Sequence, residues 1–78
     1  MQKIEKVFGA VVREQRLRLG ISQEEFAAKA GIHRTYASSI ERGTVQISIA
    51  VAVRLSAALE MPTSRLWRIV EKKVDSRE

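Results

Sequence analysis

The sequence predicts an all-α fold of five helices. Strand signals are almost missing, because the chain has one proline, four glycines and no alternating polar and apolar run bounded by turn dipeptides. Strong helix formers and apolar residues at helical spacing dominate instead. With 78 residues, the chain is expected to form a single compact domain over 1–78.

The first two helices are delimited by glycines. The first is expected over about residues 2–19, with Gly20 as its stop. Its apolar residues at near-helical spacing are Ile4, Phe8, Val11, Val12 and Leu19. The second helix begins after Ser22, because Ser22 and Glu25 have the spacing of a capping box, and it ends at Gly31.

Three further helices complete the expected fold. The third begins near His33 or Arg34 and ends at Gly43. The fourth is capped by Ser48 and has one expected inner face, formed by Ile49, Ala52, Val53, Ser56 and Leu59. The fifth runs over about 63–74 after Pro62, and the tail over 75–78 is expected to be frayed.

The second and third helices have the pattern of a helix-turn-helix. Two helices cross over a tight turn only if the crossing point is small and the turn residue tolerates an unusual backbone. Ala27 and Gly31 meet these two requirements. The apolar positions expected around them are Phe26, Ala30, Ile32, Ala37 and Ile40. Together these seven positions predict the motif strongly.

The third helix is expected to have an outer face suited to DNA. At 100° per residue, Ala37, Ile40 and one edge of Tyr36 lie inward. The outward residues are Arg34, Thr35, Ser38, Ser39 and Arg42. These residue types read base edges and contact phosphates. An ordinary solvated face is the alternative, and it is less favoured because serine and threonine are poor helix formers.

The charge is consistent with an acidic partner. A net charge of +5 and a pI near 10.3 predict attraction to nucleic acid or to an anionic membrane, although the charge also serves solubility. A membrane partner is not expected, because Glu5 and Glu14 interrupt the polar surface of the first helix and no apolar run approaches a spanning length. Without a signal-peptide pattern, the protein is expected to be cytoplasmic.

Catalysis and cofactors are not expected. The chain has no cysteine and one histidine, which argues against disulfides and metal sites. It has no glycine-rich phosphate loop, and His33 is the only neutral base available for a nucleophile. The sequence therefore predicts that the protein is not an enzyme and needs no cofactor.

Three strings also carry a family resemblance: REQRLRLGISQEEFAAKAGI, TYASSIERG and ISIAVAVRLSAALEMPTSRLW. Together they resemble the lambda repressor/Cro-type (XRE) helix-turn-helix family over about residues 8–70. The short chain, the string from His33 to Tyr36 and the following Ile-Glu-Arg-Gly look like the controller proteins of restriction-modification systems.

The resemblance implies a role for particular residues. Base contacts fall on Arg34, Thr35 and Ser38. Contacts to the DNA backbone fall on Gln23, Tyr36, Ser39, Arg42 and Gln46. Gln23 is at a helix start, where a phosphate is favoured, although a polar first-turn residue is also ordinary there. Arg16 and Glu41 match a family ion pair that stiffens the link between the first and third helices.

Two positions depart from the family pattern. His33 stands where serine, threonine or aspartate often precedes this helix, so either the helix is capped less well or the histidine itself touches DNA. A neutral residue at the helix start is the simpler reading. Ile47 replaces a common proline in the loop before the fourth helix, which leaves the form of that loop open.

The fifth helix is rich in large apolar residues. Leu66 and Val70 can face the domain, whereas Trp67, Ile69 and Val74 diverge from them. We expect a twofold interface from this helix, joined by the end of the fourth helix, with dimerisation residues Trp67, Ile69, Val70 and Val74. The alternative is that Trp67 closes the core.

These expectations combine into a transcriptional regulator. A homodimer would bind a palindromic operator in double-stranded DNA and block or recruit RNA polymerase. Glu24 and Glu25 are either an activating patch or first-turn acids that favour the helix dipole. The alternative function is an antitoxin-like module of the same fold that binds a partner protein.

Overall fold

The computed structural model describes residues 3–77, and all of its regular secondary structure in that range is helical. The helices are α1 (Ile4–Leu19), α2 (Gln23–Ala30), α3 (Arg34–Arg42), α4 (Ile49–Ala58) and α5 (Thr63–Arg77). The predicted all-α, five-helix fold is therefore confirmed. None of these helices is long and apolar enough to cross a membrane.

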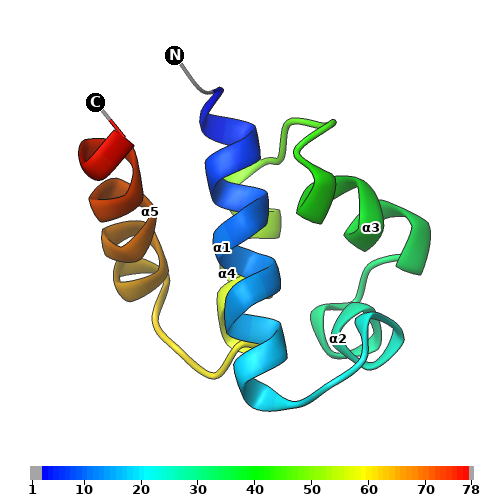
Figure 1. Ribbon diagram of the computed structural model, residues 1–78. Helices are drawn as coiled ribbons and strands as arrows, with labels where there is room; N and C mark the ends of the chain where they lie inside the picture. Colours follow the sequence, from blue (N-terminus) through cyan, green and yellow to red (C-terminus); the bar gives the residue numbers. More distant parts are fainter. Residues whose placement is uncertain (1–2, 78) are drawn as a thin grey trace.

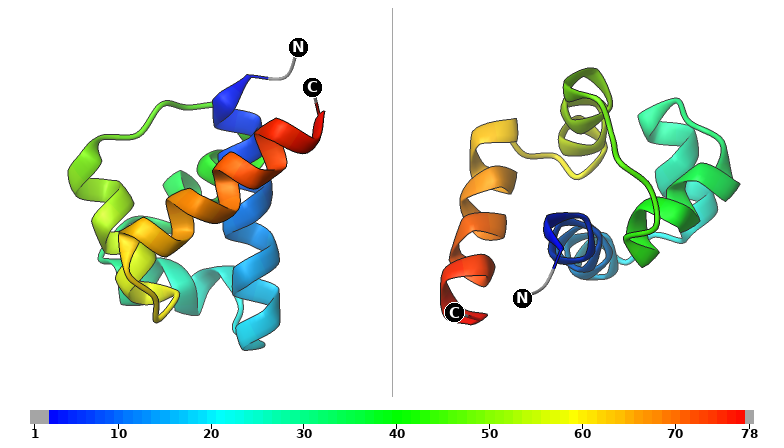
Figure 2. Two further views of the ribbon diagram at one scale, coloured as in Figure 1. Left: turned by 90° about the vertical axis from the view of Figure 1, so that its left-hand side faces the viewer. Right: turned by 90° about the horizontal axis from the view of Figure 1, so that it is seen from above.

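The long helix α1 stands at the centre of the molecule (Figure 1). Seen from above, α5 lies on one side of it, α2 and α3 lie on the other, and α4 lies behind it (Figure 2, right). The helices α1 and α3 are in direct contact, as are α1 and α5. This arrangement places α3 and α5 on opposite sides of α1.

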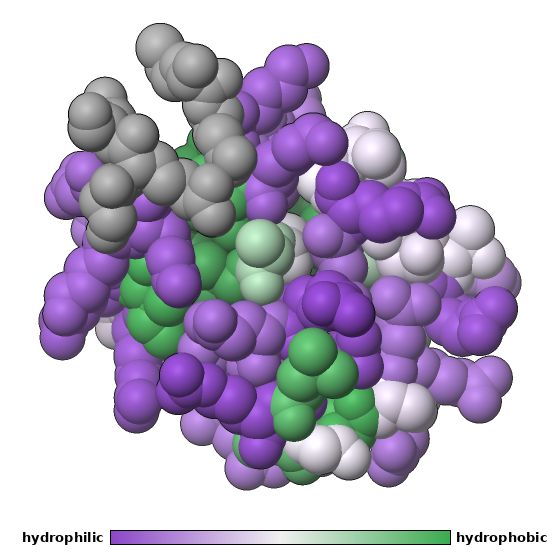
Figure 3. Space-filling view, in the orientation of Figure 1, coloured by the Kyte–Doolittle hydropathy of each residue, from purple (hydrophilic) through white to green (hydrophobic). Residues whose placement is uncertain are grey.

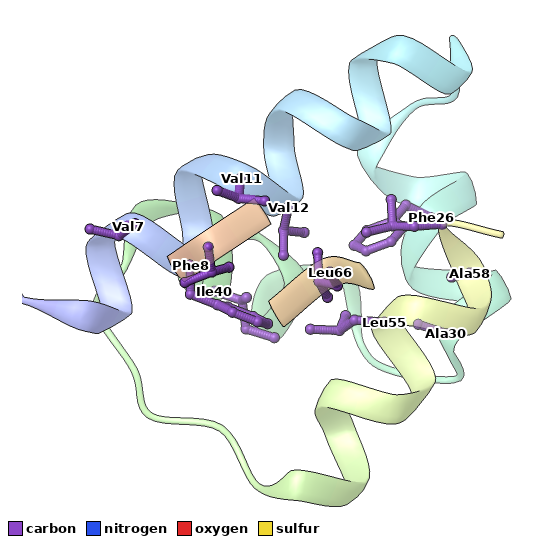
Figure 4. Packing of buried hydrophobic residues seen from close by; sticks show 12 residues of the cluster. Val7, Phe8, Val11, Val12, Phe26, Ala30, Ile40, Leu55, Ala58 and Leu66 are labelled. Atoms are coloured by element: carbon purple, nitrogen blue, oxygen red, sulfur yellow. The ribbon is translucent and has the colours of Figure 1, made fainter. Parts of the chain in front are cut away.

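Side chains from all five helices meet in one core (Figure 4). Phe26 from α2 and Leu55 from α4 are fully buried, and Ile40 from α3 and Leu66 from α5 are nearly so. Figure 4 shows Phe8 of α1 beside Ile40. Burial of a large apolar side chain contributes about 1.5–3 kcal/mol, so this shared core is the main force that holds α3 against the rest of the domain.

Two helix boundaries differ from the predictions. Helix α1 begins at Ile4, because Lys3 is its N-cap with an extended backbone; the predicted start at residue 2 lies outside the described residues. Helix α5 extends to Arg77 rather than ending near residue 74, so the prediction of a frayed tail is wrong for residues 75–77. Residues 63–77 contain no glycine or further proline, so nothing in that sequence ends the helix earlier.

The inner face of α4 was also predicted wrongly in part. Ser56 and Leu59 are buried as expected, but Ile49 is 86% exposed and Val53 is 50% exposed. The buried α4 residues that the prediction omitted are Leu55 and Ala58. Helix α4 is apolar almost all round, so periodicity alone did not identify which face packs inward.

Candidate nucleic-acid interface

The turn between α2 and α3 has the geometry that the sequence predicts. Gly31 adopts a left-handed backbone with φ of 70°. The Ile32 amide donates to the Ala27 carbonyl at 3.0 Å, and the Gly31 amide donates to the Ala28 carbonyl at 3.2 Å, which closes α2 with a Schellman-type motif. Ala27 is buried at the crossing. The predicted helix-turn-helix is therefore confirmed.

Helix α3 presents a polar outer face. Ala37 and Ile40 are buried, whereas Arg34, Thr35 and Arg42 are exposed. The remaining predicted contact residues on this helix are half-buried: Tyr36, Ser38 and Ser39. In the space-filling view, the side of the molecule formed by α2 and α3 is covered mainly by hydrophilic and neutral residues (Figure 3). The outer face thus offers hydrogen-bonding groups and positive charge with little apolar surface.

The N-terminus of α3 is capped by an unusual residue. His33 has an extended backbone, and its Nδ1 accepts a hydrogen bond from the Thr35 amide at 3.1 Å. The histidine therefore performs the capping role that serine or aspartate usually takes. The expectation of a less well capped helix is not met, since the ring nitrogen supplies the acceptor.

Hydrogen bonds also organise the outer face further along α3. The Ser39 hydroxyl donates to the Thr35 carbonyl at 3.2 Å and accepts from Nη2 of Arg42 at 3.4 Å. The Thr44 hydroxyl donates to the Ser39 carbonyl at 3.2 Å beyond the helix end. Ser39 therefore has partners within the protein, and one of them orients Arg42.

Two glycines seat α3 closely against α1. A Cβ at Gly9 would overlap the carbonyl oxygen of Ile40 and would lie 2.8 Å from that of Glu41. A Cβ at Gly43 would lie 2.5 Å from the Cα of Lys6. The backbone of α1 thus touches the backbone of α3 near its C-terminus. The sequence did not lead us to predict this role for Gly9, although a glycine inside a predicted helix often has a packing reason.

A buried ion pair adds a second link between α1 and α3. Nε of Arg16 donates to Oε2 of Glu41 at 2.7 Å, and Nη2 donates to Oε1 at 3.0 Å. Both residues are buried, and the geometry is bidentate. A third bond, from Nη1 of Arg16 to the Ile21 carbonyl at 3.0 Å, fixes the chain between α1 and α2.

The electrostatics of the pair favour a permanently charged arginine. The hydrogen bonds to Glu41 raise the pKa of Arg16, burial opposes this by lowering it, and coulombic attraction to the carboxylate adds to the rise. A basic group whose pKa is raised by folding contributes its stabilisation below its ordinary pKa and loses it as the pH rises through the raised value. Arg16 therefore contributes its full stabilisation throughout the physiological pH range.

Gln23 joins this pair from the first turn of α2. Its side-chain Nε2 donates to Oε1 of Glu41 at 3.2 Å, so one of its amide protons is used within the protein. Gln23 thus ties the start of α2 to α3 by way of the same carboxylate that binds Arg16.

The two acidic residues that follow are not equivalent. The Glu25 carboxylate accepts from the Ser22 amide at 3.2 Å, and the Glu25 amide donates to the Ser22 hydroxyl at 3.0 Å, which completes the predicted capping box. Glu24 is exposed and has no such bond. Glu25 therefore has a structural role, and Glu24 is the freer acidic group.

A second, apolar surface lies away from the polar face of α3. An open groove of about 440 Å³ runs between the start of α1, Ile40 of α3, the loop over residues 45–48, the start of α4 and the first half of α5. Its main apolar lining residues are Ile4, Phe8, Ile47, Ile49, Ala52 and Trp67. Trp67 is 48% exposed. Gln46, in the loop before α4, also lines the groove and is exposed. The sequence did not indicate this groove, because its walls come from five separate segments.

The predicted dimerisation residues of α5 fall into different environments. Val70 is fully buried in the core, so the prediction that it belongs to a partner surface is wrong for this fold. Ile69 and Val74 are half-buried and pack against the core. Trp67 is half-exposed, borders the groove and is not part of the core cluster, so the alternative that it closes the core is not supported and its role in dimerisation stays a prediction. The large exposed apolar residues of α4, Ile49 and Val53, are at its start and middle rather than at its end.

Comparison with known proteins agrees with the geometry. A sequence profile described as Helix-turn-helix matches residues 12–66. The control protein C.MunI from Mycoplasma sp. is 36% identical over 74 residues, which cover 94% of this chain and all of that protein. The crystal structure of the restriction-modification controller protein C.AhdI from Aeromonas hydrophila has 34% identity and a TM-score of 0.77, covering 80% of this chain and 94% of that chain.

A third similarity includes DNA. The structure of the controller protein C.Esp1396I, described as a tetramer in complex with its natural 35 base-pair operator, has a TM-score of 0.86 and 26% identity. It covers 95% of this chain and 97% of that chain. The similarity thus extends over the whole domain, including α5.

The fold and the outer face of α3 define a DNA-binding helix-turn-helix protein, and this chain belongs to that family, of the XRE type. Within the family, it is most like the controller proteins of restriction-modification systems. The resemblance inferred from the sequence alone is therefore confirmed.

Proposed function

We propose that this protein is a sequence-specific transcriptional regulator that binds a palindromic operator as a homodimer and controls a restriction-modification system. The observation that carries the proposal is the outer face of α3, which is polar, exposed at Arg34, Thr35 and Arg42, and held from behind by the Arg16 and Glu41 pair. A rigid helix with such a face suits the major groove.

Base recognition is assigned to the first half of α3. Arg34 and Thr35 are exposed at the N-terminal end, which enters the groove first in this kind of protein, and Ser38 follows one turn later. An arginine forms two hydrogen bonds with guanine, and threonine combines a hydroxyl with a methyl group that contacts thymine. These three residues therefore carry the proposed sequence specificity.

Phosphate contacts are assigned to residues around this half-helix. They are Gln23, Tyr36, Ser39, Arg42 and Gln46. Gln23 is supported by its position at the positive end of α2, and its bond to Glu41 holds the side chain in place. Arg42 is exposed and oriented by Ser39. Such contacts fix the register of the protein on DNA without selecting a sequence.

The groove beside Trp67 is the proposed dimer surface, with a second copy of this chain as its occupant. An exposed isoleucine, valine and tryptophan close together are unusual on a small monomer. The tetrameric C.Esp1396I complex, whose chain is similar along almost its whole length, supports self-association. A twofold dimer would place two α3 helices about 34 Å apart, on one face of the DNA.

The position of the bound dimer relative to the promoter would determine how it regulates transcription. A bound dimer blocks RNA polymerase or recruits it, depending on where the operator lies. Glu24 is the better candidate for an activating contact, because Glu25 is used in the capping box. Glu24→Gln should leave operator affinity unchanged and lower activation in a reporter assay; unchanged activation would remove Glu24 from the proposal.

Selection of bound sequences from random duplex DNA tests the proposal. We expect a palindromic consensus whose half-sites are centred about 10 base pairs apart. Affinity should fall steeply with salt, because the contacts to phosphates release counterions. Enrichment of no sequence would contradict sequence-specific binding, and a consensus without twofold symmetry would contradict the dimer.

A further inference from the structure

The net positive charge of the chain is not on the helix-turn-helix. Residues 22–43 contain three basic and three acidic residues, whereas helix α5 contains five basic and two acidic residues. The net charge of +5 predicts attraction to a polyanion, and the outer face of α3 accounts for only part of it, through Arg34 and Arg42. The excess of positive charge on α5 therefore needs an explanation beyond the binding of DNA by α3.

Three basic residues of α5 form a stripe on one face of that helix. Arg65, Arg68 and Lys72 are three and four residues apart, so they lie on the same face, and all three are exposed. Leu66 and Val70 are buried on the other side of the helix, so the stripe faces away from the core. At the rise of an α-helix, the stripe is about 10 Å long.

The two arginines of this stripe are not used within the protein. In the part of the chain that the structure describes, neither Arg65 nor Arg68 takes part in a salt bridge or a side-chain hydrogen bond. Lys73 of the same helix, in contrast, pairs with Glu14 of α1 at 3.9 Å. Exposed arginines without a carboxylate partner produce a positive potential that attracts anions.

The stripe lies on the far side of the domain from α3. Helix α5 and helix α3 are on opposite sides of α1 (Figure 2, right), and the stripe faces away from the core that they share. The domain measures 34 × 23 × 23 Å, whereas duplex DNA is stiff over about 150 base pairs. A duplex in contact with α3 therefore cannot curve round the domain to reach the stripe.

The composition of the stripe favours DNA over a protein as its partner. The core of a protein interface is apolar and depleted of charged residues. The apolar residues beside the stripe are engaged elsewhere, since Ile69 packs against the core and Trp67 borders the groove. A phosphate backbone is bound through charge alone and needs no apolar anchor.

We infer that the stripe binds the phosphate backbone of a second segment of double-stranded DNA while α3 occupies the operator. This inference rests on the proposed function and adds a second contact surface to it. The protein would then hold two DNA segments together, one selected by its sequence and the other bound through charge. The second contact would be independent of sequence and sensitive to salt.

Capture of a second duplex tests the inference. The selected operator is immobilised, saturated with protein and washed, and a fluorescent duplex without an operator site is then added. We expect wild type to retain this duplex, with an affinity that falls about 40-fold between about 50 and 200 mM salt for three phosphate contacts. The double variant Arg65→Gln, Arg68→Gln should lower that affinity about tenfold. Its operator affinity should stay within about twofold of wild type, because salt screens charges on the far side of the domain.

The matched control removes the same charge from other helices. Lys29→Gln with Arg54→Gln changes two exposed basic residues of α2 and α4, and we expect this variant to retain the second duplex as wild type does. Circular dichroism should give similar Tm values for wild type and both double variants, because all four side chains are exposed.

Three results would overturn the inference. The first is an operator-bound wild type that retains no second duplex, and the second is equal retention by the two double variants. The third is capture of polyglutamate in place of duplex, which would point to an acidic protein as the partner. Operator occupancy is measured in the same experiment, so failure of the proposed function is distinguishable: wild type would then leave the operator empty.

Discussion

The two sides of α1 are packed in opposite ways. On the side of α3, the backbones touch at Gly9 and Gly43, and the buried Arg16 and Glu41 pair joins the helices. On the side of α4 and α5, an apolar groove of about 440 Å³ remains open next to Trp67. The side of α1 that faces α3 holds that helix in one orientation, whereas the side that faces α4 and α5 leaves apolar surface exposed.

The two sides of α1 should therefore affect two different properties, the stability of the domain and its self-association. Substitutions on the side that faces α3 should unfold the domain, because buried backbone and charged groups lose their partners. Substitutions on the side that faces α4 and α5 should leave the monomer folded and change only how it associates. The predictions that follow compare these two sides, starting with the largest effect.

The ion pair should give the largest effect. Glu41→Ala leaves Arg16 buried without its carboxylate and also removes the acceptor of Gln23, so we expect a loss of about 3–5 kcal/mol in the free energy of unfolding. Chemical denaturation measures it. The exposed pair of Lys29 and Glu60 is the control, since Lys29→Ala should cost under about 1 kcal/mol. Equal losses from the two pairs would contradict the role of burial.

Gly9 should give the next effect. An alanine there would favour the helix, but its Cβ would overlap the carbonyl of Ile40, so we expect a net loss of about 1–3 kcal/mol in the free energy of unfolding. Gly20→Ala is the matched control. Its Cβ would meet nothing within 4 Å, and its cost of about 1 kcal/mol would come from the left-handed backbone alone. An increase in Tm for Gly9→Ala would contradict the close approach of α1 and α3.

Substitutions in the apolar groove should give the smallest effect on the stability of the monomer. Ile49 is largely exposed, so Ile49→Ser should change the free energy of unfolding by less than about 0.5 kcal/mol. It should nevertheless weaken the dimer, which sedimentation equilibrium measures as a fall in mass at micromolar concentration. Ala57→Ser, at an exposed site near the other end of α4, is the control. A dimer unaffected by Ile49→Ser would place the interface elsewhere.

The fold was largely predictable because its signals are local. The capping box at Ser22 and the glycines at 20, 31 and 43 mark helix ends by backbone chemistry that depends on a few neighbouring residues. The inner residues of α3 followed from helical period. The outer face of α3 could therefore be predicted from the sequence, and its exposure at Arg34, Thr35 and Arg42 agrees with the helical wheel.

The features that the sequence did not predict depend on contacts between segments that are far apart in the chain. Helix α4 is apolar on several faces, so only its packing against α2 and α5 determines that Leu55 is inside and Ile49 outside. The same holds for Val70, whose burial depends on where α5 crosses the core. The bond from Gln23 to Glu41 joins residues 18 positions apart in the chain, and no local pattern indicates it.

The central claim is that the outer face of α3 reads DNA sequence, and Arg34 tests it most directly. Affinities of wild type and Arg34→Ala should be measured for the selected operator and for its single base-pair variants. We expect Arg34→Ala to lose about 1–3 kcal/mol of discrimination at one position in each half-site and to keep its preferences elsewhere. Unchanged discrimination at every position would contradict the claim.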